Sequence, residues 1–516
     1  MKKLFSTLLV VLFLINNTNS QTPELVFNRT ASYLSSSNGK IFFTYKDSVF
    51  VSNGTTSGTQ LLYKIKGSDF TEFNGKTIFT ALDDNNEYEL WITNGTTPGT
   101  SLVKDINPTG EGYIEIISIF NNKLYFLGDD GVNGQELWVT DGTNAGTVML
   151  KDINPGSGNG LDGSQSKIYN GKLYFSANNG VNDKELWATD GTTSGTVMVK
   201  DINPSGSSSP SNFGILNNKL YFRASDNTSG KELWVTDGTG AGTVLVKDIN
   251  PGAGSSYLSN LIEYNGKLYF NVSASFNFSE PYNMWQSDGT SGGTVIYEDS
   301  TLGSYVYKGQ LYFGKISGYV APNYKYALWK TDGTPNGAVK INDLIGKSKE
   351  SPSSYTEVGG KLYFLCNYDG PGGGANYLDN DLWITDGTTA NTKLIKHTNG
   401  DTVNVYTSRT DMIEFQGSLF FTQKDNKLYK IAGTPTGIKN TTTKNFDISV
   451  YPNPVNSILN ISTKETIKKI NIYNSIGALV QTESQNIFSI VHLPAGIYHI
   501  QVQTEKGTET VQIVKE

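Results

Sequence analysis

The most regularly spaced acidic residues in this sequence belong to a turn of the form Asp-Gly-Thr. The Asp occurs at Asp141, Asp190, Asp237, Asp288, Asp332 and Asp386, and Asn replaces it at Asn53 and Asn94. Carboxylates suit Ca²⁺, but that ion needs roughly six to eight oxygens around one point, and this turn supplies one residue per copy. Asp and Asn both fold a side-chain oxygen onto nearby backbone amides. We therefore expect a structural turn here, and we predict no metal ligands and no cofactor.

The tryptophans form a second regular set. All seven are the third residue of strings such as Glu-Leu-Trp-Val-Thr-Asp-Gly-Thr: Trp91, Trp138, Trp187, Trp234, Trp285, Trp329 and Trp383. Trp rings stack well on sugars, so the set could bind a glycan. A ligand rarely needs the same residue in every repeat, whereas a repeated core does. We expect structural packing.

Three variable segments in neighbouring repeats carry a further group of aromatic residues. They are Phe276, Phe278 and Tyr282, then Tyr319, Tyr324 and Tyr326, then Tyr368 and Tyr377. Binding residues are often found on loops that a rigid scaffold positions. These residues are our predicted binding patch for a glycan or a protein, and neutral drift of loop length is the alternative.

Catalytic groups are scarce in this composition. The sequence has one Cys and three His, with no Gly-x-Ser-x-Gly string and no phosphate-binding Gly-rich loop, so we predict no catalytic residues. A single Cys also excludes a disulfide framework. The formal net charge of -7 lacks the basic character of nucleic-acid-binding proteins. Nucleic acid is therefore not an expected partner.

The elements that carry these residues follow from the repeat itself. Phe50 and Tyr429 replace the Trp in two further copies, which makes nine, spaced 41 to 54 residues apart. Each copy is expected to contain four short strands. An Asn-Gly-Lys turn joins the first two, the Glu-Leu-Trp string is the third, the Asp-Gly-Thr turn leads to the fourth, and an Asn-Pro connection leads to the next copy. Four strands per copy are typical of a β-propeller blade. We predict an all-β propeller of about nine blades, with eight as the alternative, over residues 24–437.

The segment Glu24 to Asn28 matches the fourth strand of a copy, and the ninth copy lacks that strand. We therefore expect the N-terminal strand to complete the last blade, which removes an exposed sheet edge. The repeated string resembles the bacterial ELWxxDGT repeat family, whose members are recognised mostly by the repeat. Sialidase-like propellers also combine an Asp-Gly turn with three Arg, and this chain has three, Arg29, Arg223 and Arg409, but it does not reproduce that family's Asp-box order.

Both ends of the chain indicate export. Residues 1–20 have the short basic start and apolar run of a signal peptide, and no later stretch is apolar enough for a transmembrane helix. After a linker at residues 438–445, residues 446–516 alternate like the strands of a small Ig-like β-sandwich. The strings Tyr-Pro-Asn-Pro and Leu-Pro-Ala-Gly-Ile-Tyr in this segment resemble the type A sorting domain of the type IX secretion system. That resemblance implies recognition by the type IX machinery and a secreted or cell-surface location.

A rigid ring with a poor catalytic inventory predicts a secreted or surface-displayed binding or adhesion module for glycans or proteins. One alternative is a polysaccharide-acting hydrolase or lyase, which needs paired carboxylates near one glycosidic bond. Another is a purely structural surface array.

Overall fold

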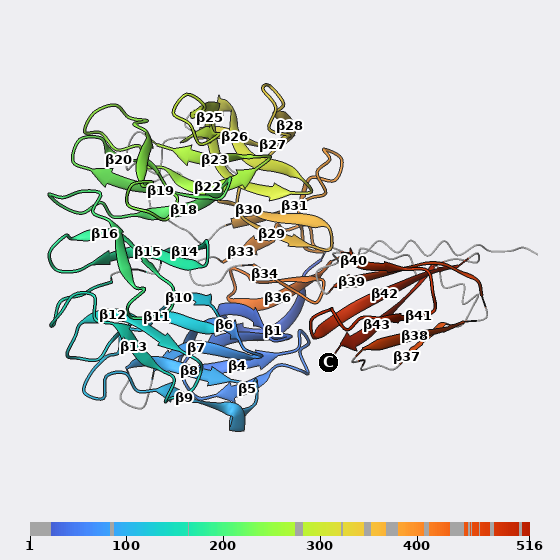
Figure 1. Ribbon diagram of the computed structural model, residues 1–516. Helices are drawn as coiled ribbons and strands as arrows, with labels where there is room; N and C mark the ends of the chain where they lie inside the picture. Colours follow the sequence, from blue (N-terminus) through green and yellow to red (C-terminus); the bar gives the residue numbers. More distant parts are fainter. Residues whose placement is uncertain are drawn as a thin grey trace, which may run out of the picture. The chain divides into compact units, whose positions relative to one another are not determined.

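The computed structural model describes residues 22–515, except 83–86, 162, 164, 274–281, 321–322, 345–351, 368–379, 407–411, 434–447, 452–454, 456, 464, 475–478 and 505–507. The chain divides into two compact units at Thr436 (Figure 1). Its described elements are β-strands apart from one short 3₁₀ helix, η1 (Thr97–Gly99). No described helix is long and apolar enough to cross a membrane. The all-β prediction is confirmed.

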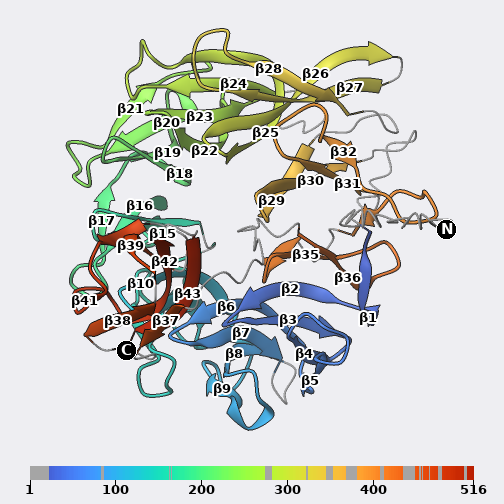
Figure 2. The same cartoon turned by 90° about the vertical axis from the view of Figure 1, so that its right-hand side faces the viewer.

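The described residues of the first unit form eight antiparallel sheets: six of four strands, one of seven and one of five. The seven-stranded sheet holds two blades that share a strand, which makes nine propeller blades, and Figure 2 shows the sheets following one another around a ring. Blades 1 to 3 are β2 (Ser32–Ser37), β3 (Lys40–Tyr45), β4 (Ser48–Ser52) and β5 (Gln60–Tyr63); β6 (Gly67–Phe73), β7 (Lys76–Leu82), β8 (Tyr88–Thr93) and β9 (Thr100–Lys104); and β10 (Glu115–Phe120), β11 (Lys123–Asp129), β12 (Gln135–Thr140) and β13 (Val148–Lys151). Blades 4 and 5 are β14 (Ser166–Tyr169), β15 (Lys172–Asn178), β16 (Lys184–Thr189) and β17 (Val197–Lys200); and β18 (Ser211–Leu216), β19 (Lys219–Asp226), β20 (Gly230–Thr236) and β21 (Val244–Lys247).

The later blades are less regular. Blades 6 and 7 are β22 (Ser259–Tyr264), β23 (Lys267–Val272), β24 (Tyr282–Ser287), the shared β25 (Val295–Tyr307), β26 (Gln310–Val320), β27 (Asn323–Thr331) and β28 (Val339–Asp343). Blade 8 is β29 (Pro352–Val358), β30 (Lys361–Asn367), β31 (Asn380–Thr385) and β32 (Lys393–Leu394), with β33 (Asn404–Val405) also pairing with β31. Blade 9 is β34 (Ile413–Phe415), β35 (Ser418–Thr422), β36 (Lys427–Ala432) and β1 (Glu24–Thr30).

Strand β25 serves two blades without a break. Its first half pairs with β24, where Trp285 lies opposite Ile296, and its second half pairs with β26, where Tyr307 lies opposite Gln310. In blades 2 to 5 an Asn-Pro pair follows the fourth strand, and Pro has no backbone N–H for a sheet ladder. The sequence between Tyr297 and Ser304 contains no Pro, and here the chain stays extended and joins blades 6 and 7 in one sheet.

The central strands of each blade are buried on both faces. In β11 the five residues Leu124 to Gly128 are all buried, because alternate side chains point toward the blades on either side. Tyr125 packs against Phe120, and the next residue, Phe126, packs against Trp138. The core is therefore a series of clusters between neighbouring blades, as expected for stacked repeats.

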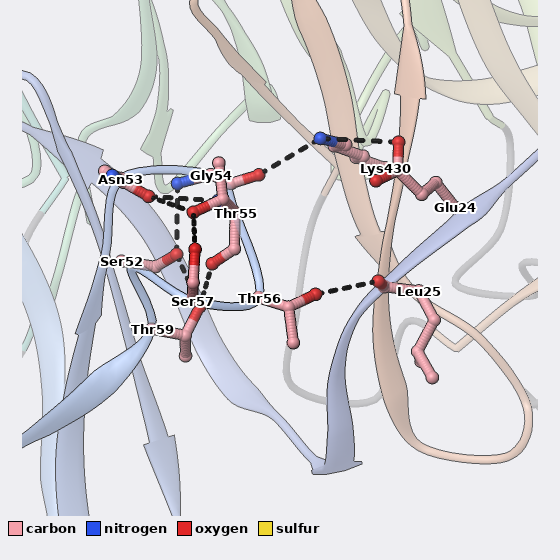
Figure 3. A network of polar contacts seen from close by, with 10 residues as sticks. All are labelled: Glu24, Leu25, Ser52, Asn53, Gly54, Thr55, Thr56, Ser57, Thr59 and Lys430. Carbon is pink, nitrogen blue, oxygen red and sulfur yellow. Dashed lines mark hydrogen bonds and ion pairs between the residues drawn. The ribbon is translucent and has the colours of Figure 1, made fainter.

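The N-terminal strand closes the ring as predicted. β1 pairs antiparallel with β36, so Glu24 lies opposite Lys430 (Figure 3). The Lys430 ammonium lies 3.4 Å from the Glu24 carboxylate and donates to the Gly54 carbonyl at 3.3 Å, which links blade 9 to the turn between β4 and β5 of blade 1. Thr56 donates to the Leu25 carbonyl at 3.3 Å. Closure leaves no unpaired edge between the last blade and the first.

The second unit is a small two-sheet sandwich. One sheet contains β37 (Ile448–Tyr451), β38 (Ile458–Thr463) and β41 (Ile487–Ser489), and the other contains β40 (Leu479–Glu483), β39 (Ile467–Asn474), β42 (Gly496–Thr504) and β43 (Thr508–Lys515). Ile472 and Ile500 lie opposite each other in the second sheet and are fully buried with Leu459 of the first. The predicted sandwich architecture is confirmed.

Candidate functional site

The repeated tryptophans are core residues in this structure. Five of them are at most 9% exposed: Trp91, Trp138, Trp187, Trp234 and Trp383. The other two, Trp285 and Trp329, are half-buried. Each buried ring sits between blades; Trp187 of blade 4, for example, packs with Leu137 and Leu150 of blade 3. Lys104 of blade 2 lies over the Trp138 ring at 5.9 Å and donates to the Thr147 carbonyl of blade 3 at 2.9 Å. These rings hold blades together and leave little face for a sugar.

The repeated Asp-Gly-Thr turns also have internal partners. The Asp190 carboxylate accepts hydrogen bonds from the Thr192 hydroxyl at 2.7 Å and the Thr192 amide at 2.9 Å. These two bonds hold the pKa of Asp190 below its ordinary value. The Thr193 hydroxyl then donates to the Leu150 carbonyl of the preceding blade at 2.8 Å. The turn therefore connects neighbouring blades, and the described residues contain no group of three His, Cys, Asp or Glu arranged to hold a metal ion.

Four of the repeated strings contain a Glu, and all four are fully buried: Glu89, Glu136, Glu185 and Glu232. Glu136 accepts from the amides of Ile153 at 2.7 Å and Asn154 at 3.0 Å, so it fastens the connection that leaves its own blade. Burial raises the pKa of Glu136 to about 7, and the same cause raises that of Glu232 to about 7. A raised carboxyl pKa is common at catalytic sites, but here the side chain has no exposed surface and binds backbone. These carboxyl groups therefore brace connections between blades.

One face of the ring carries both the connections between blades and the loops that join the second and third strands of each blade. In blade 3 the Gln135 amide, at the start of the third strand, donates to the Asn159 side chain at 3.0 Å. The Gly160 amide of the outgoing connection donates back to the Gln135 carbonyl at 2.9 Å. We call this face, typified by Asp129–Gln135 and Asn154–Gly160, the connection face.

Only part of the predicted aromatic patch lies within the described residues. Tyr282 begins β24 and is half-buried, whereas Tyr326 is 8% exposed and packs with Tyr312 and Leu328. The expected loop of blade 7 is instead a long hairpin, in which the backbones of Tyr319 and Tyr324 pair across β26 and β27. The remaining four lie outside the described residues: Phe276, Phe278, Tyr368 and Tyr377.

The arginines considered for sialidase chemistry lie in different sheets. Arg29 is in β1 of blade 9, where it lies over the Tyr45 ring at 5.5 Å. Arg223 is in β19 of blade 5 and donates to the Ser211 hydroxyl at 3.2 Å. Arg409 lies outside the described residues. The two described arginines do not form a common site.

A polar cavity of about 710 Å³ opens on the connection face between blades 8 and 9, and our sequence reasoning did not predict it. Its walls are the connection that leaves blade 8, His397–Asn404, and the loop between the second and third strands of blade 9, Gln423–Asp425. Tyr429, which replaces the repeated Trp, also lines it. The sequence did carry a signal, which was the break in the repeat. Where blades 2 to 5 have Asp-Ile-Asn-Pro, the connection that leaves blade 8 has His397-Thr-Asn-Gly400, followed by Asp401.

Residues 449–516 match the family described as the secretion system C-terminal sorting domain. This match confirms the predicted type IX sorting domain and indicates export to the cell surface or secretion. No curated protein matches the chain. The ELWxxDGT resemblance gains no support from these comparisons.

Solved structures resemble the chain only distantly. PorZ, described as an essential bacterial surface component of the type-IX secretion system of Porphyromonas gingivalis, is 11% identical, with 94% of this chain and 75% of PorZ covered and a TM-score of 0.35. The extracellular domain of the putative hybrid two-component system BT3049 from B. thetaiotaomicron is 11% identical, with 93% and 77% covered and a TM-score of 0.33. Saccharomyces cerevisiae Sqt1 is 10% identical, with 73% and 98% covered and a TM-score of 0.38.

Proposed function

We propose that this exported chain is a secreted or surface-displayed binding protein that holds a glycan or a surface protein through the connection face of blades 6 to 9. The observation that carries the proposal is that the repeated pattern is regular in blades 2 to 5 and irregular in blades 6 to 9. In blades 2 to 5 the repeated polar groups brace turns and connections, as Glu136 and Asp190 do. In blades 6 to 9 the same face departs from the pattern through the fused β25, the β26–β27 hairpin and the blade 8 connection.

The geometry supports binding better than hydrolysis. A glycosidase needs two carboxyl groups that are free to exchange protons with a substrate placed between them. The repeated Glu side chains are buried against backbone amides, and the repeated Asp side chains are held by their own turns. Two carboxylates do line the blade 8–9 cavity, but the Asp425 side chain already binds the Tyr429 hydroxyl and the Lys427 ammonium.

The purified full chain should be applied to an array of bacterial and host glycans and, in parallel, used to capture proteins from outer-membrane extracts. We expect at least one glycan or surface protein to bind in a saturable manner. Hydrolysis is measured separately as new reducing ends after incubation with the bound polysaccharides. Failure to bind in either experiment, by protein whose circular dichroism shows an intact β fold, would refute the proposal. Release of reducing ends would establish the hydrolase alternative instead.

A further inference from the structure

The cavity between blades 8 and 9 is built from two irregular segments that the backbone locks together. The Lys424 amide donates to the Asn404 carbonyl at 3.2 Å, and the Tyr406 amide donates to the Thr422 carbonyl at 2.8 Å. An isolated bridge between Val405 and Gln423 continues this pairing. The walls therefore come from two blades but form one backbone-bonded surface. At about 710 Å³ the cavity falls within the usual range of ligand pockets.

Gln423 supplies an unused donor to this cavity. Its side chain lines the cavity although the residue is only 7% exposed, and its Oε1 lies 3.0 Å from Nε2 of His397. An amide oxygen only accepts, so in this contact the Nε2–H tautomer of the imidazole donates to it. The amide Nε2 is buried and makes no hydrogen bond within the described part of the chain. A buried donor without a partner is costly, so an acceptor entering the cavity is favoured once the amide turns to meet it.

Acceptors line the same cavity. Asp401 accepts from the Asn399 side chain at 2.7 Å and belongs to the loop next to His397. Asp425 accepts from the Tyr429 hydroxyl at 2.9 Å, and the Lys427 ammonium lies 3.3 Å from it. Each carboxylate has lone pairs beyond these contacts, since an ionised carboxylate offers about four acceptor sites. The cavity is therefore lined by a residue with a buried amide donor, Gln423, and by two exposed carboxylates.

This combination discriminates between ligand classes. The lining carries Asp401 and Asp425 against the single cation Lys424, so its net charge disfavours an anionic ligand. The two carboxylates supply fewer oxygens than a hard metal ion needs, and the described residues contain no group of three His, Cys, Asp or Glu arranged to hold one. A hydroxyl group both donates and accepts, so neighbouring hydroxyls on a sugar ring satisfy the amide and the carboxylates together. We propose that this cavity is a binding subsite for a neutral saccharide unit, a proposal that rests on the proposed binding function and names its ligand class.

The test uses the purified full chain and a panel of neutral probes: glucose, galactose, mannose, fucose, rhamnose and N-acetylglucosamine. Saturation-transfer NMR and titration should detect binding of at least one of them. We expect Gln423→Leu and Asp401→Asn each to raise the Kd about tenfold, because each removes a hydrogen bond to the sugar. Gln60→Leu, an exposed glutamine in β5, is the matched control and should leave the Kd unchanged. Asp401 is exposed, so its substitution tests the site even if Gln423→Leu fails to fold.

Galacturonate, sialic acid and Ca²⁺ are the contrasting probes. Tighter binding of any of these than of the neutral sugars, lost on Asp401→Asn, would overturn the proposal. So would neutral-sugar binding that neither cavity variant weakens. If the glycan array is positive but insensitive to both variants, this subsite is wrong while the proposed binding function stands. If proteins alone bind to the chain and no neutral sugar does, the saccharide subsite is likewise refuted.

Discussion

Gly191 makes a close contact between neighbouring blades that a single substitution can test. This glycine follows Asp190 in the turn of blade 4 and has φ +95°. A Cβ at this position would meet the hydroxyl of Tyr125 in blade 3 at 2.6 Å. Tyr125 is 1% exposed and packed against Phe120, so its ring cannot swing away cheaply. Gly238 and Tyr174 repeat this contact in the next pair of blades, at 2.7 Å.

The magnitude follows from a matched control. Gly252 has φ +96° and nothing within 4 Å of a built Cβ, so Gly252→Ala carries only the backbone strain of a left-handed alanine, about 1–2 kcal/mol. Gly191→Ala carries the same strain plus the clash with Tyr125, and overpacking of this kind costs about 1–3 kcal/mol more. We therefore expect Gly191→Ala to lower the free energy of unfolding by about 2–5 kcal/mol.

The assay is urea unfolding followed by tryptophan fluorescence, which reports on rings that lie between blades. Tyr125→Phe removes the clashing hydroxyl, so the double variant Tyr125→Phe with Gly191→Ala should recover about 1–3 kcal/mol relative to the sum of the single changes. Equal losses for Gly191→Ala and Gly252→Ala, or no recovery in the double variant, would refute the inter-blade contact as the cause.

Three further predictions concern pH, closure and export. Burial raises the pKa of Glu136 and Glu232 from 4.5 to about 7, so the folded state retains protons that the unfolded state loses. The contribution of each of these carboxyl groups to stability is full below about pH 4.5 and falls by about 3 kcal/mol as the pH rises to 7. Urea unfolding at pH 5 and pH 7.5 should show a smaller fall for Glu232→Gln, and an unchanged fall would mean that the carboxyl is ionised in the fold. Deleting Glu24–Thr30 exposes the edge of β36, so we expect the Tm to fall by more than about 5 °C and the protein to self-associate on gel filtration. Glu24→Ala is the control: it removes one exposed ion pair and should lower the free energy of unfolding by less than about 1 kcal/mol. Removing residues 446–516 should keep the protein from the cell surface and medium, measured by immunoblotting of cell fractions, and unimpaired export would contradict the sorting role of this segment.

Much of the fold was predictable because its determinants are local. The Asn-Gly turn at Asn170 has both residues at positive φ, as a tight turn between two strands requires, and Gly191 has the positive φ expected beside Asp190. Where local chemistry changed, the structure changed with it. The segment after Tyr297 lacks the Asn-Pro of blades 2 to 5, and β25 continues unbroken where the repeat predicted a connection.

The candidate site was less accessible to sequence reasoning. Aromatic content drew attention to the loops of blades 6 to 8, yet Tyr326 is buried between blades because β26 and β27 continue as a hairpin. Gln423 carried no signal of its own, since its importance depends on burial and on His397, 26 residues away in the sequence. A break in a repeat marks where to look, but it does not identify which side chains meet.

The sequence by itself determined the strands, the turns and the sorting sandwich, because strand alternation and turn chemistry depend on residues a few positions apart. Only the tertiary structure shows that the Glu136 carboxylate binds backbone amides and that the tryptophans pack between blades. It also brings Asn404 and Gln423 together at a polar cavity. Such contacts depend on how neighbouring blades stack. Stacking brings together residues that lie far apart in the sequence, and no pattern of neighbouring residues predicts which of them meet.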